Sequence, residues 1–272
     1  MGYNLNFHQS FSPEREAIAQ LVRLAIQGSG FLTKEEISQI TTIPTGESSG
    51  KVVPHINYAD IMGLLNIENK GKSFKLSPTP LGEVIGAEDP YFVEPITMWA
   101  CHYNLVAKNS KGLIWSYVFN EVAPQLGTSF SKEILPSVVN KNFEAEVNLT
   151  PFRSSYLNDR SFATLKILCE IGGNYLFTPH KIDPSFKYLY AYQLLSSWEE
   201  CMEDRTEVTI DDIKDTLYYG RPYLWEDRDI LNVLELLQDE RIIVLNRQLN
   251  PLTILRQESS RNLLTQIYSL LI

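Results

Sequence analysis

Apolar residues recur at helical spacing near the start of the chain. Ile18, Leu21, Val22 and Ile26 follow the spacing of one helix face. The stretch "SPE" (12–14) just before them is typical of a helix start, because Ser caps the first turn, Pro fits its first position and an acid is favoured near the positive helix end. The pattern therefore predicts an amphipathic helix that ends at the following "GSG".

Two more helices and a hairpin are predicted to follow. Thr33 and Glu36 have the spacing of a capping box, which indicates a second helix. Residues 51–62 predict a third helix, with Pro54 tolerated in its first turn. The stretch "GLLNIENKGKSFKLSPTPLGE" (63–83) sets a short polar loop between two apolar runs and then opens another helix. Helix, helix, helix and hairpin is the order of a winged helix-turn-helix.

The end of the chain predicts the same order of elements. Helices are expected over 183–202, 209–217 and 225–240, and the segment 241–255 reads as a hairpin with "NRQLN" as its turn. The two blocks share no obvious sequence identity. We therefore predict a second winged-helix-like module from element order and length alone.

The middle of the chain is rich in aromatic residues. Residues 93–108 and 113–125 predict two helices joined by "NSKG", followed by helices over 131–140 and 160–171. The stretches "TSFSKE", "NLTPFRSSYLNDR" and "GGNYLFTPHKIDP" read as loops.

These patterns together predict a mainly α fold with three domains. Residues 1–86 would form the winged helix-turn-helix, residues 87–182 an aromatic-rich helical middle domain, and residues 183–272 the second winged-helix-like module. No low-complexity linker separates them, so we expect the domains to pack against one another.

Composition and charge narrow the classes of partner. The chain has 272 residues, of which 44% are hydrophobic and 21% charged, as in ordinary globular proteins, and no apolar run predicts a membrane span. Residues 1–77 hold seven Lys and Arg and seven Asp and Glu, whereas residues 183–256 hold eight against fifteen. DNA contact is therefore expected nearer the N-terminus. The three cysteines form no CxxC pair, which favours a reducing cytoplasm.

The first module offers cations and polar groups to DNA. The candidate contacts are Lys51, His55 and Asn57 near the start of the third predicted helix, and Lys70, Lys72 and Lys75 on the hairpin. Cationic side chains can pair with phosphates, but lysines in a turn are also commonly solvated, and winged helices also bind proteins. Both readings stay open here. In the last module, acids at the start of the third helix (226–229) would repel phosphates, which favours a packing or protein-partner role.

One polar group among the middle aromatics is a candidate for chemistry. Two antiparallel helices would bring the faces of Trp99 and Trp115 together and place His102 near Asn120 or Glu121. Such a group could act in acid–base chemistry or hold a divalent ion. The alternative is an aromatic core with a hydrogen-bonded His. The chain contains no P-loop, no GxSxG, and no HxxxH or HxxE pair.

Several short motifs resemble one known family. They are "FHQSF" with Arg15 shortly after, "PTPLGE", "DPYFVEPITMWACHYNL", "WSYVFNE" and "YAYQLLSSWEE". In order and spacing the chain resembles the SspB family of DNA phosphorothioation systems, whose members are encoded beside PAPS-reductase-like partners. The resemblance covers most of residues 7–256, with Arg15 one residue later than the family pattern and 151–171 matching only loosely.

The resemblance implies a cytoplasmic, non-membrane protein of phage defence that nicks DNA before sulfur insertion. The site residues that it implies are His8, Arg15, His102, Asn120 and Glu121. In this reading a His is the general base or a metal ligand, Glu121 binds a divalent metal (Mg or Mn), and Arg15 clamps a phosphate. The partners implied are DNA, the PAPS-reductase-like sulfur-transfer protein and other components of the system, and a homo-oligomer stays open.

Two other roles remain at this stage. The chain could be a non-catalytic adaptor that binds DNA and docks the PAPS-reductase-like protein through its acidic module. A transcription regulator is the weaker reading, because a simple repressor needs neither this length nor an acidic second module.

Overall fold

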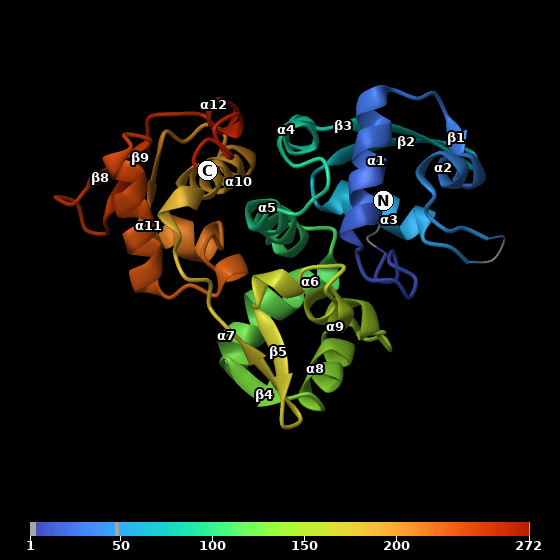
Figure 1. Cartoon of the computed structure of the whole chain (residues 1–272). Coiled ribbons are helices and arrows are strands. Elements are labelled where there is room, and N and C mark those ends of the chain that lie inside the picture. The colour runs from blue at the N-terminus through green and yellow to red at the C-terminus, as the bar shows by residue number, and fades with distance from the viewer. Residues whose placement is uncertain (1–3, 47–48, 272) are drawn as a thin grey trace. The chain divides into compact units, whose positions relative to one another are not determined.

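The chain folds into two compact units, an N-terminal unit of residues 1–178 and a C-terminal unit of residues 179–272. The computed structural model describes residues 4–46 and 49–271 (Figure 1). The N-terminal unit includes the first two domains predicted from the sequence, and the boundary predicted between them stays a prediction. Within the described part of the chain, no helix is long and apolar enough to cross a membrane.

The first part of the N-terminal unit combines four helices with a small sheet. Its elements are α1 (Arg15–Gln27), β1 (Leu32–Thr33), α2 (Lys34–Thr41), α3 (Val52–Ile61), β2 (Leu65–Lys70), β3 (Ser73–Pro78) and α4 (Pro80–Glu88). The three strands are antiparallel in the order β1-β3-β2. The three helices and the hairpin lie where the sequence predicts them, and β1 adds an edge strand.

Local signals explain where two of these helices begin. The cap predicted at Ser12 is wrong, because α1 begins at Arg15 with Glu14 as its N-cap residue and has no side-chain cap. The Thr33 hydroxyl accepts a hydrogen bond from the Glu36 backbone N–H, and a Glu36 carboxyl oxygen accepts from the Thr33 N–H at 2.7 Å, so the predicted capping box is confirmed. The Thr79 hydroxyl caps α4 in the same way. On α1, Leu21 and Val22 are buried as predicted, whereas Ile26 is 46% exposed and lies outside the core.

The middle of the chain mixes helices with a second small sheet. Its elements are α5 (Pro95–Val106), α6 (Leu113–Tyr117), the π-helix η1 (Val118–Val122), α7 (Ala123–Leu126), β4 (Ser129–Ser131), α8 (Ile134–Phe143), α9 (Thr150–Leu157), η2 (Ala163–Leu165), β5 (Leu168–Ile171) and β6 (Asn174–Phe177). The strands are antiparallel in the order β4-β6-β5.

The second sheet corrects the predicted fold class. The helix predicted over 160–171 is wrong, because that segment holds η2 and β5, and two predicted loops contain β4 and β6. Gly172 and Gly173, both at positive φ, turn the chain between β5 and β6. A short apolar run does not show by itself whether its backbone forms hydrogen bonds with a neighbouring strand or within a helix. The protein is therefore mixed helical and antiparallel β rather than mainly α.

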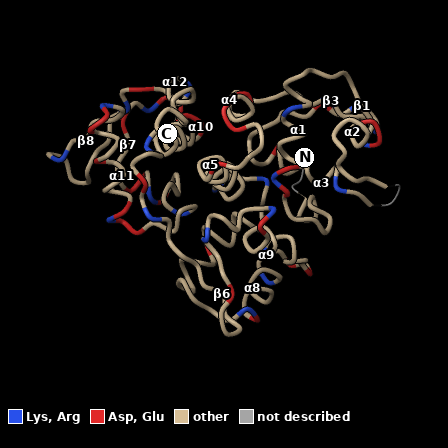
Figure 2. Tube along the Cα trace, viewed as in Figure 1, with Lys and Arg blue, Asp and Glu red and all other residues tan. Residues whose placement is uncertain are grey.

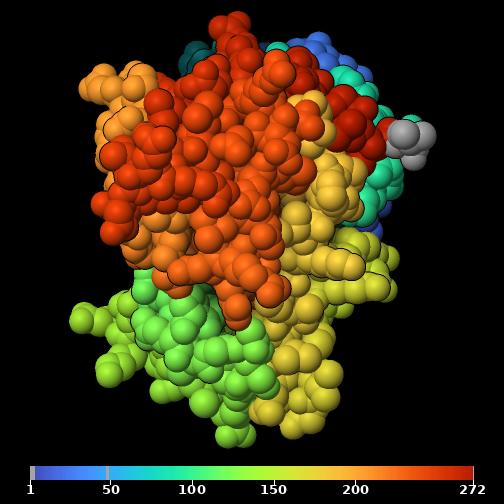
Figure 3. Space-filling view, turned by 90° about the vertical axis from the view of Figure 1, so that its left-hand side faces the viewer, coloured from blue at the N-terminus to red at the C-terminus, as the bar shows by residue number. Residues whose placement is uncertain are grey.

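The C-terminal unit has its own sheet and core. Its elements are η3 (Pro184–Phe186), α10 (Lys187–Cys201), β7 (Glu207–Thr209), the π-helix η4 (Asp212–Thr216), η5 (Arg221–Tyr223), α11 (Asp227–Asp239), β8 (Ile243–Asn246), β9 (Thr253–Arg256) and α12 (Ser260–Leu264). The strand order is β7-β9-β8, all antiparallel. In the space-filling view of Figure 3 this unit is coloured from gold to red.

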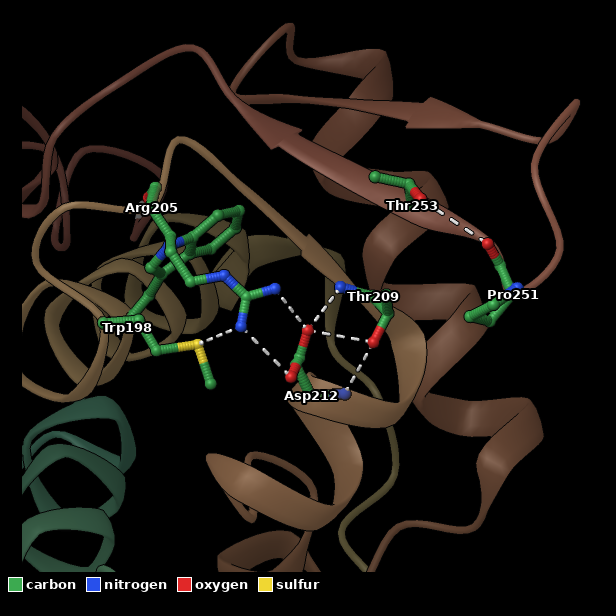
Figure 4. Close-up of polar contacts among 7 residues, drawn as sticks. Trp198, Arg205, Thr209, Asp212, Pro251 and Thr253 are labelled. Carbon is green, nitrogen blue, oxygen red and sulfur yellow. Dashed lines mark hydrogen bonds and ion pairs between the residues drawn. The ribbon is translucent and has the colours of Figure 1, made fainter.

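A carboxylate organises the turn from β7 into η4 (Figure 4). Asp212 accepts hydrogen bonds from the Thr209 N–H at 2.8 Å and from Arg205 Nη2 at 2.8 Å, while the Thr209 hydroxyl accepts from the Asp212 N–H at 3.1 Å. Burial raises the pKa of Asp212, but the hydrogen bonds from Thr209 and Arg205 outweigh it and hold the pKa below its usual value. Thr209 therefore caps this turn, and the helix predicted over 209–217 is largely the π-helix η4.

Candidate functional site

Helix α3, the candidate DNA-reading helix, is covered by the rest of the N-terminal unit. None of residues 51–62 is exposed. Lys51 Nζ forms an ion pair with Glu14 at 2.6 Å. His55 is fully buried: its Nδ1–H donates to the Lys51 carbonyl at 2.7 Å, and its Nε2 accepts from the Glu14 N–H at 3.0 Å. Burial lowers the pKa of His55, so the ring is neutral and joins α3 to the start of α1.

The same helix holds the segment that precedes α1. The Asn57 side-chain amide donates to the Phe7 carbonyl at 3.1 Å, and the Tyr58 hydroxyl donates to the Phe11 carbonyl at 2.9 Å. Lys51, His55 and Asn57 therefore all contact the chain between Phe7 and Glu14. In this arrangement α3 fastens the N-terminal segment and presents no exposed side chain to a DNA groove.

The β2–β3 hairpin presents two exposed cations. Lys70 and Lys72 are exposed next to the turn, and Lys70 Nζ lies 5.7 Å from the centroid of the Phe31 ring. Lys75 is half-buried and pairs with Glu68 at 3.3 Å. The hairpin can thus meet phosphates through Lys70 and Lys72 more readily than through Lys75. Cationic and acidic positions are interspersed along both units (Figure 2).

The two histidines implied by the family motifs lie in aromatic surroundings. His102 is fully buried, with Nδ1 3.0 Å from the Tyr156 hydroxyl and its ring centroid 4.8 Å from that of Phe119. His8 is also fully buried, with its ring edge-on to Trp115 at 5.7 Å. Its Nδ1–H donates to the Gln9 carbonyl at 2.9 Å, while burial lowers its pKa. Neither ring reaches solvent.

One aromatic cluster connects these motif segments. The Trp115 ring contacts Phe7 and Phe152, and Phe152 in turn contacts Phe119 and Tyr156. The segments "FHQSF", "MWACHY" and "WSYVFNE" therefore meet with α9 in one core. Aromatic pairs at these separations stabilise a fold beyond the area they bury.

Asn120 and Glu121 occupy different environments. Asn120 is 4% exposed, and its side-chain amide donates to the Val106 carbonyl at 2.8 Å and to Ser116 Oγ at 3.0 Å. Glu121 is half-buried, and burial together with the Glu121 charge raises the pKa of Tyr117. Among the residues that the structure describes, no three His, Cys, Asp or Glu side chains are grouped to hold a metal ion. The implied ligands are thus not part of such a three-residue group, and the Mg or Mn cofactor stays a prediction.

Arg15, one of the implied site residues, lines a surface cavity. Its Nη2 donates to the Asp159 carbonyl at 2.6 Å, and its backbone N–H donates to the Arg160 carbonyl at 2.9 Å. The cavity, about 260 Å³, also includes the loop residues Tyr91 and Val93. Sequence reasoning missed Arg160 and Tyr91 as site residues. Arg160 lies in the stretch that matches the family pattern loosely. Tyr91 lies inside a family motif from which only His102 was chosen as a candidate.

The "DP" of the family motif has a structural role. Asp89 is 3% exposed, and its carboxyl oxygens accept from the Val93 N–H at 3.0 Å, the Glu94 N–H at 3.0 Å and the Thr97 hydroxyl at 2.6 Å. These bonds shape the loop between α4 and α5 and hold it against the start of α5.

Asp89→Asn is expected to lower the free energy of unfolding of the N-terminal unit by about 1–2 kcal/mol, because an amide N–H₂ would face N–H donors. Thermal unfolding followed by circular dichroism measures the loss. Glu88→Gln, at the exposed neighbouring position, is the matched control and should leave the transition unchanged. Equal thermal unfolding transitions for the two variants would show that the hydrogen bonds accepted by Asp89 do not stabilise the loop.

Comparison with known proteins shows a shared fold. A family model described as a protein of unknown function, DUF4007, matches residues 56–164. Among curated proteins, none matches. A structure described as magnesium ion-bound SspB is 14% identical with a TM-score of 0.76, and a second SspB crystal structure is 16% identical with a TM-score of 0.75. Each match covers 97% of this chain and 86% of the other. The resemblance indicated by the motifs is thus confirmed at the level of the fold: over nearly its whole length this chain has the fold of SspB.

Proposed function

We propose that this protein is a DNA-binding component of a bacterial DNA phosphorothioation system and acts in phage defence in the cytoplasm. The likeness to SspB over 97% of the chain is the observation that carries the proposal. The family resemblance adds a PAPS-reductase-like sulfur-transfer protein and other components of the system as partners.

We assign α1 to α3 and the β2–β3 hairpin to a winged helix-turn-helix. The order of elements and the three-stranded sheet support the assignment. Because α3 has no exposed residue, we propose that DNA is held through its backbone rather than read by α3 in the major groove. The exposed Lys70 and Lys72 are the hairpin's contribution to that contact.

DNA nicking is the activity that the family resemblance assigns to this component. It requires a group that activates water or another nucleophile near the scissile phosphate. Arg15 lines a surface cavity and Glu121 is half-buried, which supports these two of the implied residues as the ones that would contact a substrate. The divalent ion belongs in the test because one solved SspB structure is described as magnesium-bound.

A non-catalytic adaptor is the second candidate, and one observation favours it. His8, His102 and Asn120 are buried in the core of the N-terminal unit, where they cannot meet a phosphodiester without a rearrangement. The C-terminal unit holds ten Lys and Arg against sixteen Asp and Glu, which suits a protein partner better than DNA. We propose this unit as the docking site for the sulfur-transfer protein.

Plasmid relaxation and DNA binding test the proposal together. The full chain is incubated with supercoiled plasmid and Mg²⁺ or Mn²⁺, beside Glu121→Ala and His102→Ala. Binding is followed in parallel by fluorescence anisotropy in a salt series. We expect DNA binding that falls about 40-fold between 50 and 200 mM salt if three phosphates are contacted.

The outcomes separate the candidates. Open-circle product that disappears in folded Glu121→Ala supports a nickase with that residue in its site. Equal nicking by all variants places the activity at other residues or in a contaminant. Salt-sensitive binding without nicking supports the adaptor. No binding to DNA under any condition would overturn the proposed function.

A further inference from the structure

Three adjoining surface cavities run along α9 and the segment after it. Their volumes are about 560, 570 and 260 Å³. Arg153 lines both the first and the second, and Asp159 and Arg160 line both the second and the third. We call this continuous depression, from Tyr175 through Arg153 and Arg160 to Tyr91, the α9 groove.

An arginine stands at each junction of the α9 groove. The Arg153 side chain is 51% exposed and forms a two-pronged ion pair with Glu170, one bond of which is 2.9 Å long. Arg160 is exposed, and within the described residues its guanidinium makes no hydrogen bond or ion pair. Arg15 lies in the third cavity with a buried Nε–H that has no acceptor in the described part of the chain. Guanidinium groups with donors to spare are suited to phosphates.

Acidic residues also line the α9 groove, namely Glu14, Glu16, Glu146 and Asp159. Glu170 pairs with Lys132 at 3.1 Å as well as with Arg153, and Glu14 pairs with Lys51. Glu16, Glu146 and Asp159 are exposed, and water and salt screen their charges as they screen those of Arg153 and Arg160. The lining therefore has no net positive charge, and the groove offers a phosphate the local hydrogen-bond donors of its arginines.

An exposed aromatic ring completes the third cavity. Tyr91 is 68% exposed, and the Arg23 guanidinium carbon lies 5.4 Å from its ring centroid. The ring is on a well-fastened loop, because Phe92 next to it is 2% exposed and Asp89 holds Val93 by a hydrogen bond. A large aromatic face presented to solvent beside arginines is the arrangement on which unpaired nucleic-acid bases stack.

We propose that the α9 groove binds a single DNA strand, with Arg153 and Arg160 on its phosphates and Tyr91 stacked on an unpaired base. The inference rests on the proposed function and names the form of DNA and the surface that takes it. A duplex hides its bases from such a ring, so the groove favours a strand that is already melted, nicked or gapped.

The test measures the fluorescence anisotropy of labelled oligothymidylate, labelled oligouridylate and a labelled duplex with the full chain and its variants. Arg160→Ala is expected to weaken single-strand binding about tenfold and to flatten the salt dependence by about one phosphate contact. Tyr91→Ala is expected to weaken it about 5- to 100-fold, whereas Tyr91→Trp keeps the stacking face and retains affinity. Arg228→Ala, at an exposed position of α11 in the C-terminal unit, is the matched control for loss of one exposed arginine. Thermal unfolding verifies that each variant is folded.

The outcomes distinguish the α9 groove from the proposed function and from the assignment to DNA. The α9 groove is supported if Arg160→Ala and Tyr91→Ala weaken single-strand binding, Tyr91→Trp retains it and Arg228→Ala changes it little. Wild-type DNA binding that survives both groove changes would overturn the groove and leave the proposed function standing. Absence of DNA binding by the wild type would overturn both. Tighter binding of oligouridylate through the same residues would overturn the assignment to DNA.

Discussion

Replacing Trp115 by Ala is expected to lower the free energy of unfolding of the N-terminal unit by about 3–5 kcal/mol. Trp115 is fully buried, and its ring contacts those of Phe7, Tyr58 and Phe152 at centroid distances of 5.6, 5.8 and 6.1 Å. Its indole N–H also donates to Ser155 Oγ at 3.3 Å. Truncation therefore opens a cavity where the N-terminal segment, α3 and α9 meet.

Tyr117→Ala is the matched control for Trp115→Ala. Tyr117 lies two residues further along α6, is half-buried and contacts the Phe143 ring at 5.5 Å. Its loss is expected to cost about 1 kcal/mol, because its site can fill with water. Urea unfolding followed by far-ultraviolet circular dichroism gives both values. Similar costs for the two variants would contradict a role for Trp115 as the centre of the core.

A second effect of the Trp115 change is local. Hydrogen exchange at the Phe11 amide, which bonds to the His8 carbonyl at 2.9 Å, should become faster in Trp115→Ala than in Tyr117→Ala. Exchange that is unchanged would show that α3 holds the segment without help from the aromatic cluster.

The C-terminal unit is expected to lose about 3 kcal/mol of stability as the pH falls from 6.5 to 4, through His180. Burial among Phe186, Tyr223 and Trp225 lowers the pKa of His180 to about 4, although the Asp183 charge opposes the shift. In this pH range His180 is protonated in the unfolded chain but stays neutral in the folded protein. Stability from this group is therefore full above pH 6.5 and is lost as the pH decreases toward the folded pKa.

His180→Phe removes the titrating ring and keeps an aromatic side chain in its place. Urea unfolding of the full chain at several pH values gives the dependence of the free energy of unfolding on pH. Amide exchange in residues 179–271 monitors the C-terminal unit in these experiments. The variant is expected to be less stable at pH 7, because His180 Nε2 loses its contact with the Tyr190 hydroxyl at 2.8 Å, but to show a flatter slope between pH 6.5 and 4. If the free energy of unfolding changes with pH equally in wild type and variant, groups other than His180 cause the acid sensitivity.

The sequence by itself determined the elements whose signals are local. Thr33 and Glu36 bond to each other's backbone three residues apart, and Thr209 caps the turn that begins at Asp212 in the same way. Such bonds form within one turn of chain, so the residue pattern is sufficient to predict them. The order of helices and hairpins at both ends followed from the same kind of signal.

Only the tertiary structure decided which candidates face solvent and which short runs pair as strands. His55 bonds to the Glu14 backbone 41 positions away, and Arg15 bonds to the Asp159 carbonyl 144 positions away. The same holds for β4, whose hydrogen bonds are completed by β6, a strand distant in sequence. A local pattern contains no information about such partners, because burial and sheet pairing are set by the whole packed chain. For that reason the motif histidines lie in the core, while Arg160 and Tyr91 line the groove.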